Sequence, residues 1–596
     1  MELLNLDGVI EKGVFEIPSY QRGYAWQKEQ LKDFWNDLEH VSKLGDKFHY
    51  MHSLTLRELE NEFEDSAFEI IDGQQRLATS LILLGLLAKI TQNKDPKYDS
   101  MNLEPVLSYK YYGLSEAFRA IMEEEKDLER FQTSFYAKNL IEAYEFFQEK
   151  ISDTPMETLE KMFDALIKKM LFSVVELNDN RIDPFSSFET INNRGKDLST
   201  LELLKNRLHF VAHKICDEGD LENLQQEIND TYTRIYHDLR FFEDTHLGDF
   251  LKYFVAYYYG EKRDFKERLL NTAFDAHKKY DDLYDEYEKI NDLLLYLSYS
   301  SKVWYFLHTL DDEELRIEIT PKTRGLLDKM RRLNALSNNA FLPLLLSLLT
   351  IQLAVRSGSE RHYTTKELEG LLEYLERFGF LIYGVAGKNA AKNEWIELAF
   401  EAFRAYRYGE ENTAIKDLPT LEKNFFKGEH SGLELLEESI HSKKNTEKWY
   451  KWGKALNYLL YEYELHHNPE TTLNFDGSLE SIEHILPQNP DQGYSAKEKN
   501  WAKNPNIVHA LGNLLLIPKN TNSSLSNKPF EEKRKEYLKG SYSEKEVAKN
   551  ASFGIIEIQE RSEKLLDFLI AHYRIAELVG ENEIKDFKNA FLKEIK

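Results

Sequence analysis

The chain has 596 residues and a mass of 70.2 kDa, which is too long for a single hydrophobic core, so we expect about three or four domains. Its formal net charge of −26 excludes a protein that coats nucleic acid nonspecifically, because phosphates would be repelled, but it does not exclude a nuclease whose basic groups gather in one groove. The only cysteine, Cys216, excludes an intramolecular disulfide and a zinc ribbon, and it fits a cytoplasmic protein.

Residues 1 to about 215 mix strand-like and helical patterns. GVFEIP (13–18) and FSVVEL (172–177) are short runs rich in apolar β-branched and aromatic residues, which is typical of strands. A helix is expected after residue 26, because apolar side chains recur there at helical spacing: Leu31, Phe34, Trp35 and Leu38. We therefore expect an α/β domain in this part of the chain.

Three polar motifs in this region each stand before a helical pattern. They are EIPSYQRGYAW (16–26), EIIDGQQRLATSLILL (69–84) and FETINNRGKDLSTLELLKNRL (188–208). Helix N-termini favour anions, arginine forks match phosphate oxygens, and glycine lets backbone amides approach closely. The motifs therefore predict that one anion binds among Gln21, Arg22, Trp26, Asp72, Gly73, Gln74, Gln75, Arg76, Asn192, Asn193, Arg194, Gly195 and Lys205. The alternative for DGQQR is a tight turn that feeds a helix, with Arg76 paired to a carboxylate.

From about 216 to 420 the pattern is almost wholly helical. Aromatic residues in segments such as KYDDLYDEYEKINDLLLYLSYS (279–300) are expected to pack between helices, while the acidic runs form solvated faces. FLPLLLSLLTIQLAV (341–355) is shorter than the roughly 20 residues that span a membrane, so we expect a buried helix. GVAGKNAAK (384–392) looks like a P-loop, but Ile382 stands where its first glycine would be, so we expect a connection between helices.

The C-terminal part, from about residue 421, contains two segments with strand character. SIEHILPQ (481–488) is typical of a short strand that Pro487 ends. LGNLLLIPKNTNSSLSNKPFEEKRKEY (511–537) predicts a strand (513–517), then a loop rich in asparagine and serine, and then a helix.

This order of strand, strand and helix, with a histidine on the first strand, resembles the HNH, or ββα-metal, nuclease finger. The resemblance implies that Glu483 binds a metal, that His484 deprotonates the attacking water, and that Asn513 orients His484. It also implies Asn522 as the second metal ligand, with Asn520 as the competing choice. A hard divalent cation held by oxygen atoms, Mg²⁺ or Mn²⁺, would neutralise the scissile phosphate, and a neutral imidazole can accept the water's proton. Glutamate stands where this finger usually has aspartate, and asparagine stands where it usually has its last histidine.

Other basic groups near these segments have less specific patterns. His466 and His467 lack a third ligand at a useful spacing, so we expect them to be surface residues. The run Lys533, Arg534 and Lys535 fits either contacts to backbone phosphates or a solvated helix face.

The three N-terminal motifs together resemble the ParB-like domain in the GmrS half of GmrS/GmrD-type modification-dependent (type IV) restriction enzymes, and the finger resembles the GmrD half. The resemblance implies an α+β, predominantly helical fold with three parts. Residues 1–215 would be a ParB-like domain that binds and hydrolyses a nucleoside triphosphate (GTP or ATP). Residues 216–420 would be a helical linking domain, and residues 421–596 an HNH-type nuclease domain embedded in helices.

The resemblance also implies roles for single residues of the N-terminal motifs. Carried over to this chain, Asp72 would position the metal-nucleotide, and Gln74 and Gln75 would contact the water or the phosphates. Arg76 and Arg22 would contact the phosphate charge.

The function that the resemblance implies is a cytoplasmic, nucleotide-regulated DNA endonuclease of bacterial anti-phage defence. Its expected partners are a nucleotide and DNA, the latter carrying a modified cytosine or a modified backbone. No membrane partner is expected, and a homodimer is left open. Two alternatives stay open as well: a nucleotide-binding switch or adaptor whose finger is inactive, and an RNA nuclease.

Overall fold

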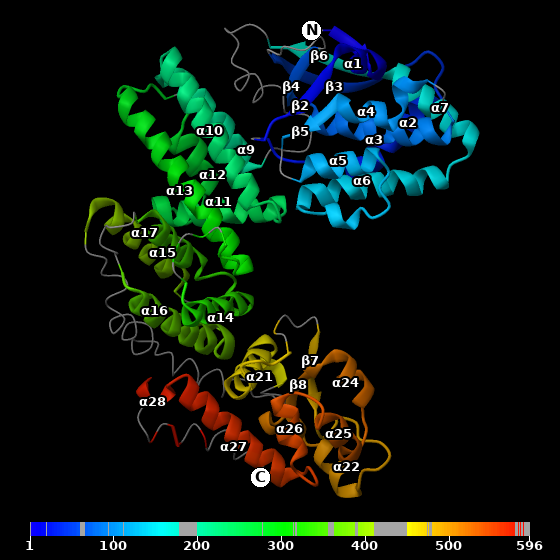
Figure 1. The fold of residues 1–596 in the computed structure, drawn as a ribbon. Coiled ribbons are helices and arrows are strands. Elements are labelled where there is room, and N and C mark those ends of the chain that lie inside the picture. The colour runs from blue at the N-terminus through cyan, green and yellow to red at the C-terminus, as the bar shows by residue number, and fades with distance from the viewer. Residues whose placement is uncertain are drawn as a thin grey trace. The chain divides into compact units, whose positions relative to one another are not determined.

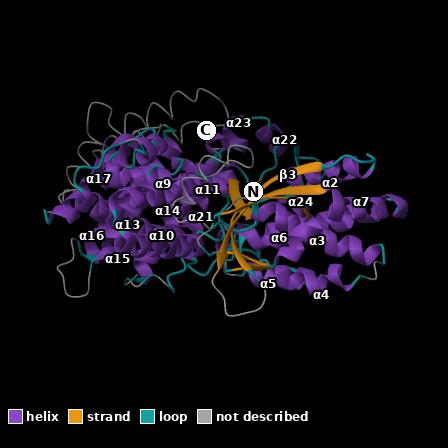
Figure 2. Ribbon diagram, turned by 90° about the horizontal axis from the view of Figure 1, so that it is seen from above, coloured by secondary structure: helices purple, strands orange, loops and turns teal. Residues whose placement is uncertain are grey.

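The computed structural model describes residues 2–578 except 20, 60–65, 93–94, 111–112, 178–198, 277, 314, 316, 318, 356–362, 388–390, 411–449, 474 and 476–478, and beyond them residues 582, 584, 585 and 588. The chain divides into two compact units, Met1–Phe306 and Leu307–Lys596. Helices dominate the secondary structure (Figure 2), and the strands among the described residues form one mixed sheet and one antiparallel pair. The predominantly helical α+β fold is therefore confirmed, whereas the boundaries expected near 215 and 420 stay predictions.

The N-terminal unit contains a six-stranded mixed sheet with the strand order β1-β6-β3-β4-β2-β5. Its strands are β1 (Glu2–Asn5), β2 (Val14–Ile17), β3 (His49–Leu59), β4 (Ala67–Asp72), β5 (Leu107–Tyr109) and β6 (Met170–Glu176). The pairs β1–β6 and β3–β4 are antiparallel, and the other three pairs are parallel. Phe15 of β2 stands opposite Phe68 of β4, and both rings are buried. β2 and β6 confirm the two strands expected in this region.

Helices α2 to α7 gather on one side of this sheet (Figure 1). With the short elements between them, the helices are α1 (Leu6–Lys12), α2 (Lys28–Ser42), α3 (Gln74–Ile90), η1 (Pro96–Tyr98), α4 (Ser100–Leu103), η2 (Glu104–Val106), α5 (Leu114–Met122), η3 (Glu129–Phe131), α6 (Phe135–Ser152) and α7 (Met156–Lys169). All four apolar side chains expected on α2 are buried. Among them, Trp35 stacks on Phe147 of α6, with ring centroids 6.2 Å apart. The helix expected after residue 26 is therefore confirmed.

The other described elements of this unit are helices. They are α9 (Thr200–Ile215), α10 (Glu218–Asp238), α11 (Asp244–Tyr259), α12 (Phe265–Glu267), the π-helical turn η4 (Arg268–Ala273) and α13 (Leu283–Thr309). Trp304 of α13 is buried, and its ring lies 5.8 Å from that of Phe250 and 5.9 Å from that of Tyr253, both on α11. Aromatic rings therefore pack between these helices as expected.

The C-terminal unit begins with helices that surround an apolar core. They are α14 (Pro321–Ser337), α15 (Leu342–Ala354), α16 (Thr365–Phe378), the π-helical turn η5 (Gly379–Val385) and α17 (Lys392–Tyr408). α15 is buried over Leu342–Ile351, and the hydroxyl of Ser347 donates to the carbonyl of Ala399 in α17 over 2.8 Å. This confirms the buried helix expected in 341–355. No helix in the described part of the chain is long and apolar enough to cross a membrane.

The antiparallel strands β7 and β8 lie among the last helices of this unit (Figure 1). The elements are η6 (Tyr450–Trp452), α21 (Lys454–His467), β7 (Glu480–His484), α22 (Ala496–Ala502), α23 (Pro505–Val508), η7 (Leu511–Asn513), β8 (Leu514–Pro518), α24 (Lys519–Leu525), α25 (Phe530–Tyr537), α26 (Tyr542–Ala548), α27 (Ile555–His572) and α28 (Ile575–Leu578). Glu483 pairs with Leu515 and His484 with Leu514, so both expected strands and their pairing are present. His466 and His467 are exposed at the end of α21, as expected.

The expected loop after the second strand is in fact the helix α24. Its polar sequence KNTNSSL favours a loop, because asparagine and serine side chains compete with the helical backbone. Tertiary contacts stabilise the helix instead. Leu525 is fully buried, and the Asn522 amide donates to Ser481 and to the carbonyl of Ile482, both on β7.

Candidate functional site

The DGQQR motif forms a sharp turn from β4 into α3, centred on Gly73. Its φ of +100° is one that other residues rarely adopt, and a Cβ at this position would lie 2.9 Å from the carbonyl oxygen of Ser53. Glycine therefore lets β4 end against β3 and α3 begin at once with Gln74.

The three glutamines of the first two motifs join these motifs through hydrogen bonds between their side-chain amides and the backbone. Gln21 donates to the carbonyls of Ile70 and Ile71 on β4, over 2.8 and 3.2 Å. Gln74 donates to the carbonyl of Arg22 over 3.2 Å. The Gln75 side chain donates to the carbonyl of Gly23 over 3.0 Å and accepts the backbone N–H of Ala25 over 2.8 Å. These amides hold the polypeptide around Arg22 in place, and their predicted contacts to water or phosphate stay predictions.

Arg22 joins these motifs to the start of α9. Its guanidinium contacts the Glu202 carboxylate through Nε at 3.1 Å and through an NH group at 3.2 Å, and both residues are buried. Glu202 also accepts the backbone N–H of Ser199 over 2.8 Å, which caps α9. Lys205 lies one turn further along α9 and is buried; burial lowers its pKa to about 8, against the opposing effect of Glu202 and Glu69.

Asp72 and Arg76 form a second ion pair at the same turn. Their side chains approach to 3.2 Å, and Asp72 also accepts the hydroxyl of Ser53 over 3.3 Å. A second guanidinium nitrogen of Arg76 donates to the carbonyl of Met51 over 3.1 Å. This agrees with the alternative in which Arg76 pairs with a carboxylate, although such a pair can still exchange for a phosphate.

The structure thus brings the first two motifs together with the end of the third. Trp26 lies just before α2, with its ring 6.1 Å from that of Phe34. The four predicted residues Asn192, Asn193, Arg194 and Gly195 lie outside the described residues. The described groups form a cluster of buried and half-buried cations, each beside a carboxylate, and the predicted binding of an anion there stays a prediction.

At the C-terminal site, His484 ends β7 in contact with a second imidazole. Its Nε2 lies 3.0 Å from Nδ1 of His509, and its Nδ1 lies 3.3 Å from the amide nitrogen of Gln488. Both histidines are buried, at 6% and 7% exposure, and the ring of Tyr450 covers them. Burial, with the positive charges that His509 and Lys533 can carry, lowers the pKa of His484 to about 3. The ring is therefore neutral at physiological pH, as a proton acceptor requires.

Glu483 is held by Lys533, one strand position before His484. The Lys533 ammonium lies 2.5 Å from Glu483 Oε1, and it also donates to the carbonyls of His484 and Ile485 over 2.9 and 3.3 Å. Tyr537 donates to the same Glu483 oxygen over 3.1 Å. Lys533 is fully buried, so the expectation of a phosphate contact or a solvated position was wrong for this residue. Phe530, Lys533 and Tyr537 share the inner face of α25.

Asn513 fixes the backbone around the two histidines. Its amide accepts the N–H of Leu486 over 2.7 Å and donates to the carbonyls of Leu486 and Val508 over 2.9 and 2.7 Å. Leu486 follows His484 by two residues, and Val508 directly precedes His509. Asn513 therefore holds the backbone that carries His484. The predicted role, in which Asn513 orients the His484 side chain, stays a prediction.

The two predicted asparagine ligands differ in their surroundings. Asn522 is half-buried, and its amide nitrogen donates to Ser481 over 2.8 Å and to the carbonyl of Ile482 over 3.2 Å. Asn520 is exposed on α24. Both stay predicted metal ligands.

Sequence reasoning missed three partners of the predicted residues. Glu202 belongs to the third motif, and its position three residues after Ser199 is the pattern of a helix capping box. Lys533 has the spacing of a core position between Phe530 and Tyr537. His509 stands in the apolar run IVHALG, where an imidazole needs a polar partner.

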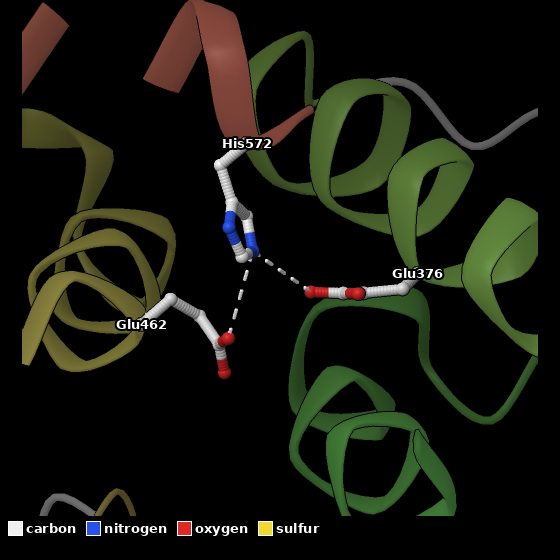
Figure 3. Close-up of side chains that lie close together, drawn as sticks. All are labelled: Glu376, Glu462 and His572. Carbon is white, nitrogen blue, oxygen red and sulfur yellow. Dashed lines mark ion pairs between the residues drawn. The ribbon is translucent and has the colours of Figure 1, made fainter. Parts of the chain in front are cut away.

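A further cluster of carboxylates and imidazole lies elsewhere in the C-terminal unit. Glu376 of α16, Glu462 of α21 and His572 of α27 point toward one another (Figure 3). The His572 Nε2 lies 3.7 Å from Glu376 and 3.8 Å from Glu462. The Lys329 ammonium lies 3.0 Å from Glu376 and 2.8 Å from Glu462, and Arg332 pairs with Glu462 over 3.0 Å. Because cations of the chain already neutralise both carboxylates, this cluster is an ion-pair network.

Comparison with known families identifies the two ends of the chain. Residues 3–209 match the family model described as GmrSD restriction endonuclease, N-terminal domain, and residues 436–568 match GmrSD restriction endonucleases, C-terminal domain. Among curated proteins, none matches the chain. The two matched domains are those of a restriction endonuclease, an enzyme that cuts DNA in phage defence. The chain belongs to the GmrSD restriction endonuclease family.

Proposed function

We propose that this chain is a cytoplasmic, nucleotide-regulated DNA endonuclease that cuts modified phage DNA with an HNH-type finger. The observation that carries the proposal is the neutral imidazole of His484, held at the end of β7 by His509 and by backbone that Asn513 fixes. The β7–β8 pair followed by α24 has the order of a ββα finger.

His484 acts in this proposal as the general base for phosphodiester hydrolysis. The bond between the water oxygen and phosphorus forms as the bond to the leaving sugar oxygen breaks. The water proton passes to His484, and solvent protonates the leaving oxygen. Because His484 is unprotonated at physiological pH, one of its ring nitrogens has a lone pair for this proton, while the burial that lowers its pKa also makes the ring a weaker base than an exposed imidazole.

A divalent metal, Mg²⁺ or Mn²⁺, is part of the proposal, with Glu483 and either Asn522 or Asn520 as oxygen ligands. When bound, such an ion neutralises charge on the phosphate. The donors as arranged do not fit a cation, because the Lys533 ammonium lies 2.5 Å from Glu483 and already neutralises its carboxylate. A metal ion would compete with Lys533 for the Glu483 carboxylate.

The N-terminal cluster is proposed to bind and hydrolyse a nucleoside triphosphate, GTP or ATP. Arg22, Arg76 and Lys205 supply positive charge, and each has a carboxylate neighbour that a phosphate can replace. Asp72 would then be free to position the nucleotide's metal. The hydrogen bonds around Arg22 support this proposal. Gln21 of the first motif binds β4, and Gln74 of the second motif binds the carbonyl of Arg22, so the two motifs together hold Arg22 in the cluster.

A cleavage assay with the full chain tests the proposal. DNA with plain cytosine, with glucosylated or hydroxymethylated cytosine, and with a phosphorothioate backbone is incubated with Mg²⁺ or Mn²⁺, with and without GTP or ATP. We expect nucleotide-dependent cutting of one modified DNA by the wild type and none by His484→Ala. Full-rate cutting of plain DNA without nucleotide would contradict the regulated, modification-dependent part.

The two alternatives have their own outcomes in this assay. If wild type and His484→Ala both leave every substrate whole while nucleotide still binds, the chain is a nucleotide-binding switch. If a competing RNA is cut in preference to DNA, the chain is an RNA nuclease.

A further inference from the structure

We propose that His509 is a positioning residue for the reaction: its Nδ1 accepts the Nε2–H of His484, which leaves Nδ1 of His484 as the atom that takes the proton from water. This inference rests on the proposed nuclease function of His484. It assigns a task to a buried histidine that the finger motif does not include.

The contact between the two imidazoles is short and shielded from solvent. The His484 Nε2 and His509 Nδ1 atoms are 3.0 Å apart, a normal hydrogen-bond length, and both residues are more than nine-tenths buried. A buried ring N–H group without a hydrogen-bond acceptor destabilises the folded protein. The bond to His509 therefore fixes the orientation of the His484 ring.

The neighbours of His484 select its tautomer. The amide nitrogen of Gln488 donates to His484 Nδ1 over 3.3 Å, so Nδ1 has no hydrogen and the hydrogen is on Nε2, facing His509. In the other tautomer, two donors would face each other at Nδ1. Gln488 is exposed and its bond is long, so an incoming water can take its place at this nitrogen.

His509 is itself held in place by the backbone and by an aromatic ring. The backbone N–H of His509 donates to the carbonyl of Pro505 over 3.1 Å, and the Asn513 amide donates to the carbonyl of the preceding residue, Val508, over 2.7 Å. Tyr450 stacks on His509 with ring centroids 5.3 Å apart and planes at 20°, and it contacts His484 at 4.8 Å and 58°. One ring thus limits the rotation of both imidazoles.

The arrangement matters most when His484 has taken a proton. The imidazolium has hydrogen on both nitrogens, and the one on Nε2 still has its acceptor in His509, so no rearrangement is needed. Without an acceptor at this position, the same buried N–H would be unpaired. The cost falls on the protonated ring of the transition state, so the turnover rate is affected more than substrate binding.

The test compares kcat and KM of DNA cleavage by the full chain with four variants. His509→Ala should lower kcat roughly 10- to 100-fold, the rate equivalent of one unpaired buried N–H, with KM changed less than about twofold. His509→Asn, whose amide oxygen can accept the same hydrogen, should restore most of kcat. His484→Ala should be inactive, and His466→Ala, at an exposed histidine of α21, should match the wild type.

Each contrary result has a distinct meaning. A wild-type kcat in His509→Ala, with His484→Ala inactive, would overturn the positioning role alone. Equal loss in His509→Asn and His509→Ala, with melting temperatures unchanged, would overturn the acceptor role. His484→Ala cutting at the wild-type rate would refute the proposed function and this inference with it. If His509→Ala melts early, His509→Leu fills the space without an acceptor and takes its place in the comparison.

Discussion

At the scale of single residues, Gly512 and Asn513, which directly precede β8, show how close packing and polar contacts combine at the candidate nuclease site. A Cβ on Gly512 would lie 2.0 Å from the carbonyl oxygen of Ile558 and 2.6 Å from the hydroxyl of Ser562, both on α27. The Gly512 N–H donates to that hydroxyl over 2.8 Å, and its carbonyl accepts Arg561 over 2.9 Å. Glycine is thus required for α27 to approach the backbone next to Asn513.

Gly512→Ala should therefore lower the free energy of unfolding by about 3 kcal/mol, the upper part of the range for forced overpacking. Gly325→Ala is the matched control, because Gly325 is an exposed glycine inside α14 with nothing within 4 Å of the added Cβ. It should be stabilising by about 0.5–1 kcal/mol. Urea unfolding followed by circular dichroism measures both, and similar values for the two variants would contradict the packing argument.

The buried pair of Glu483 and Lys533 gives a second prediction at this scale. Burial raises the pKa of Glu483 and lowers that of Lys533, although each partner opposes the shift of the other. Burial therefore disfavours the charged forms of both residues, and each charge is stabilised by the opposite charge of its partner. Lys533→Met should destabilise the protein by about 3–5 kcal/mol, because it leaves a buried carboxylate without its cation.

The pH dependence of Lys533→Met follows from the raised pKa of Glu483. Between the unfolded value of 4.5 and the higher folded value, the folded state binds more protons. Stability of the variant should therefore rise as the pH falls through the folded pKa, and the double variant Glu483→Gln with Lys533→Met should lack this rise. Melting temperatures from pH 8 to pH 5 test it, and a monotonic loss on acidification in the single variant would count against the pair.

At the scale of elements, sequence patterns predicted those helices and strands whose own residues decide their structure. The apolar spacing of α2, the apolar run of α15 and the short apolar strands β7 and β8 needed no distant partner to be found. α24 was missed because its asparagines and serines favour a loop, and contacts to β7 decide its structure.

The candidate site was predictable to the same degree. The motif residues were found, but their partners were not, because Arg22 and Glu202 are 180 positions apart and His484 and His509 are 25 positions apart. The residues of a single motif do not predict contacts to residues so far away in the sequence.

The ion-pair network of α14, α16, α21 and α27 gives an element-scale prediction. Glu462 is 2% exposed and pairs with Lys329 and Arg332. Glu462→Gln should cost about 3–5 kcal/mol, because it leaves buried cations without their shared carboxylate. Glu373→Gln removes the carboxylate of an exposed pair with Lys322 on the same helices and should cost less than about 1 kcal/mol. Equal thermal shifts in the two variants would show that the buried network is not important for stability.

At the scale of the whole molecule, the chain consists of two compact units, each with its own core. We expect two transitions in calorimetry of the full chain, because separate cores unfold separately. Gly512→Ala should lower one melting temperature and leave the other unchanged. A single transition that moves as a whole in this variant would mean that the two units unfold together.

In the proposed function, one chain joins a nucleotide-hydrolysing cluster around Asp72 to a DNA-cutting imidazole at His484. The most direct test measures nucleotide hydrolysis and cleavage of modified DNA together in wild type, Asp72→Ala and His484→Ala. We expect Asp72→Ala to lose hydrolysis and, with it, regulated cutting, whereas His484→Ala should lose cutting alone and still hydrolyse nucleotide. Undiminished cutting by His484→Ala, or undiminished hydrolysis by Asp72→Ala, would contradict it.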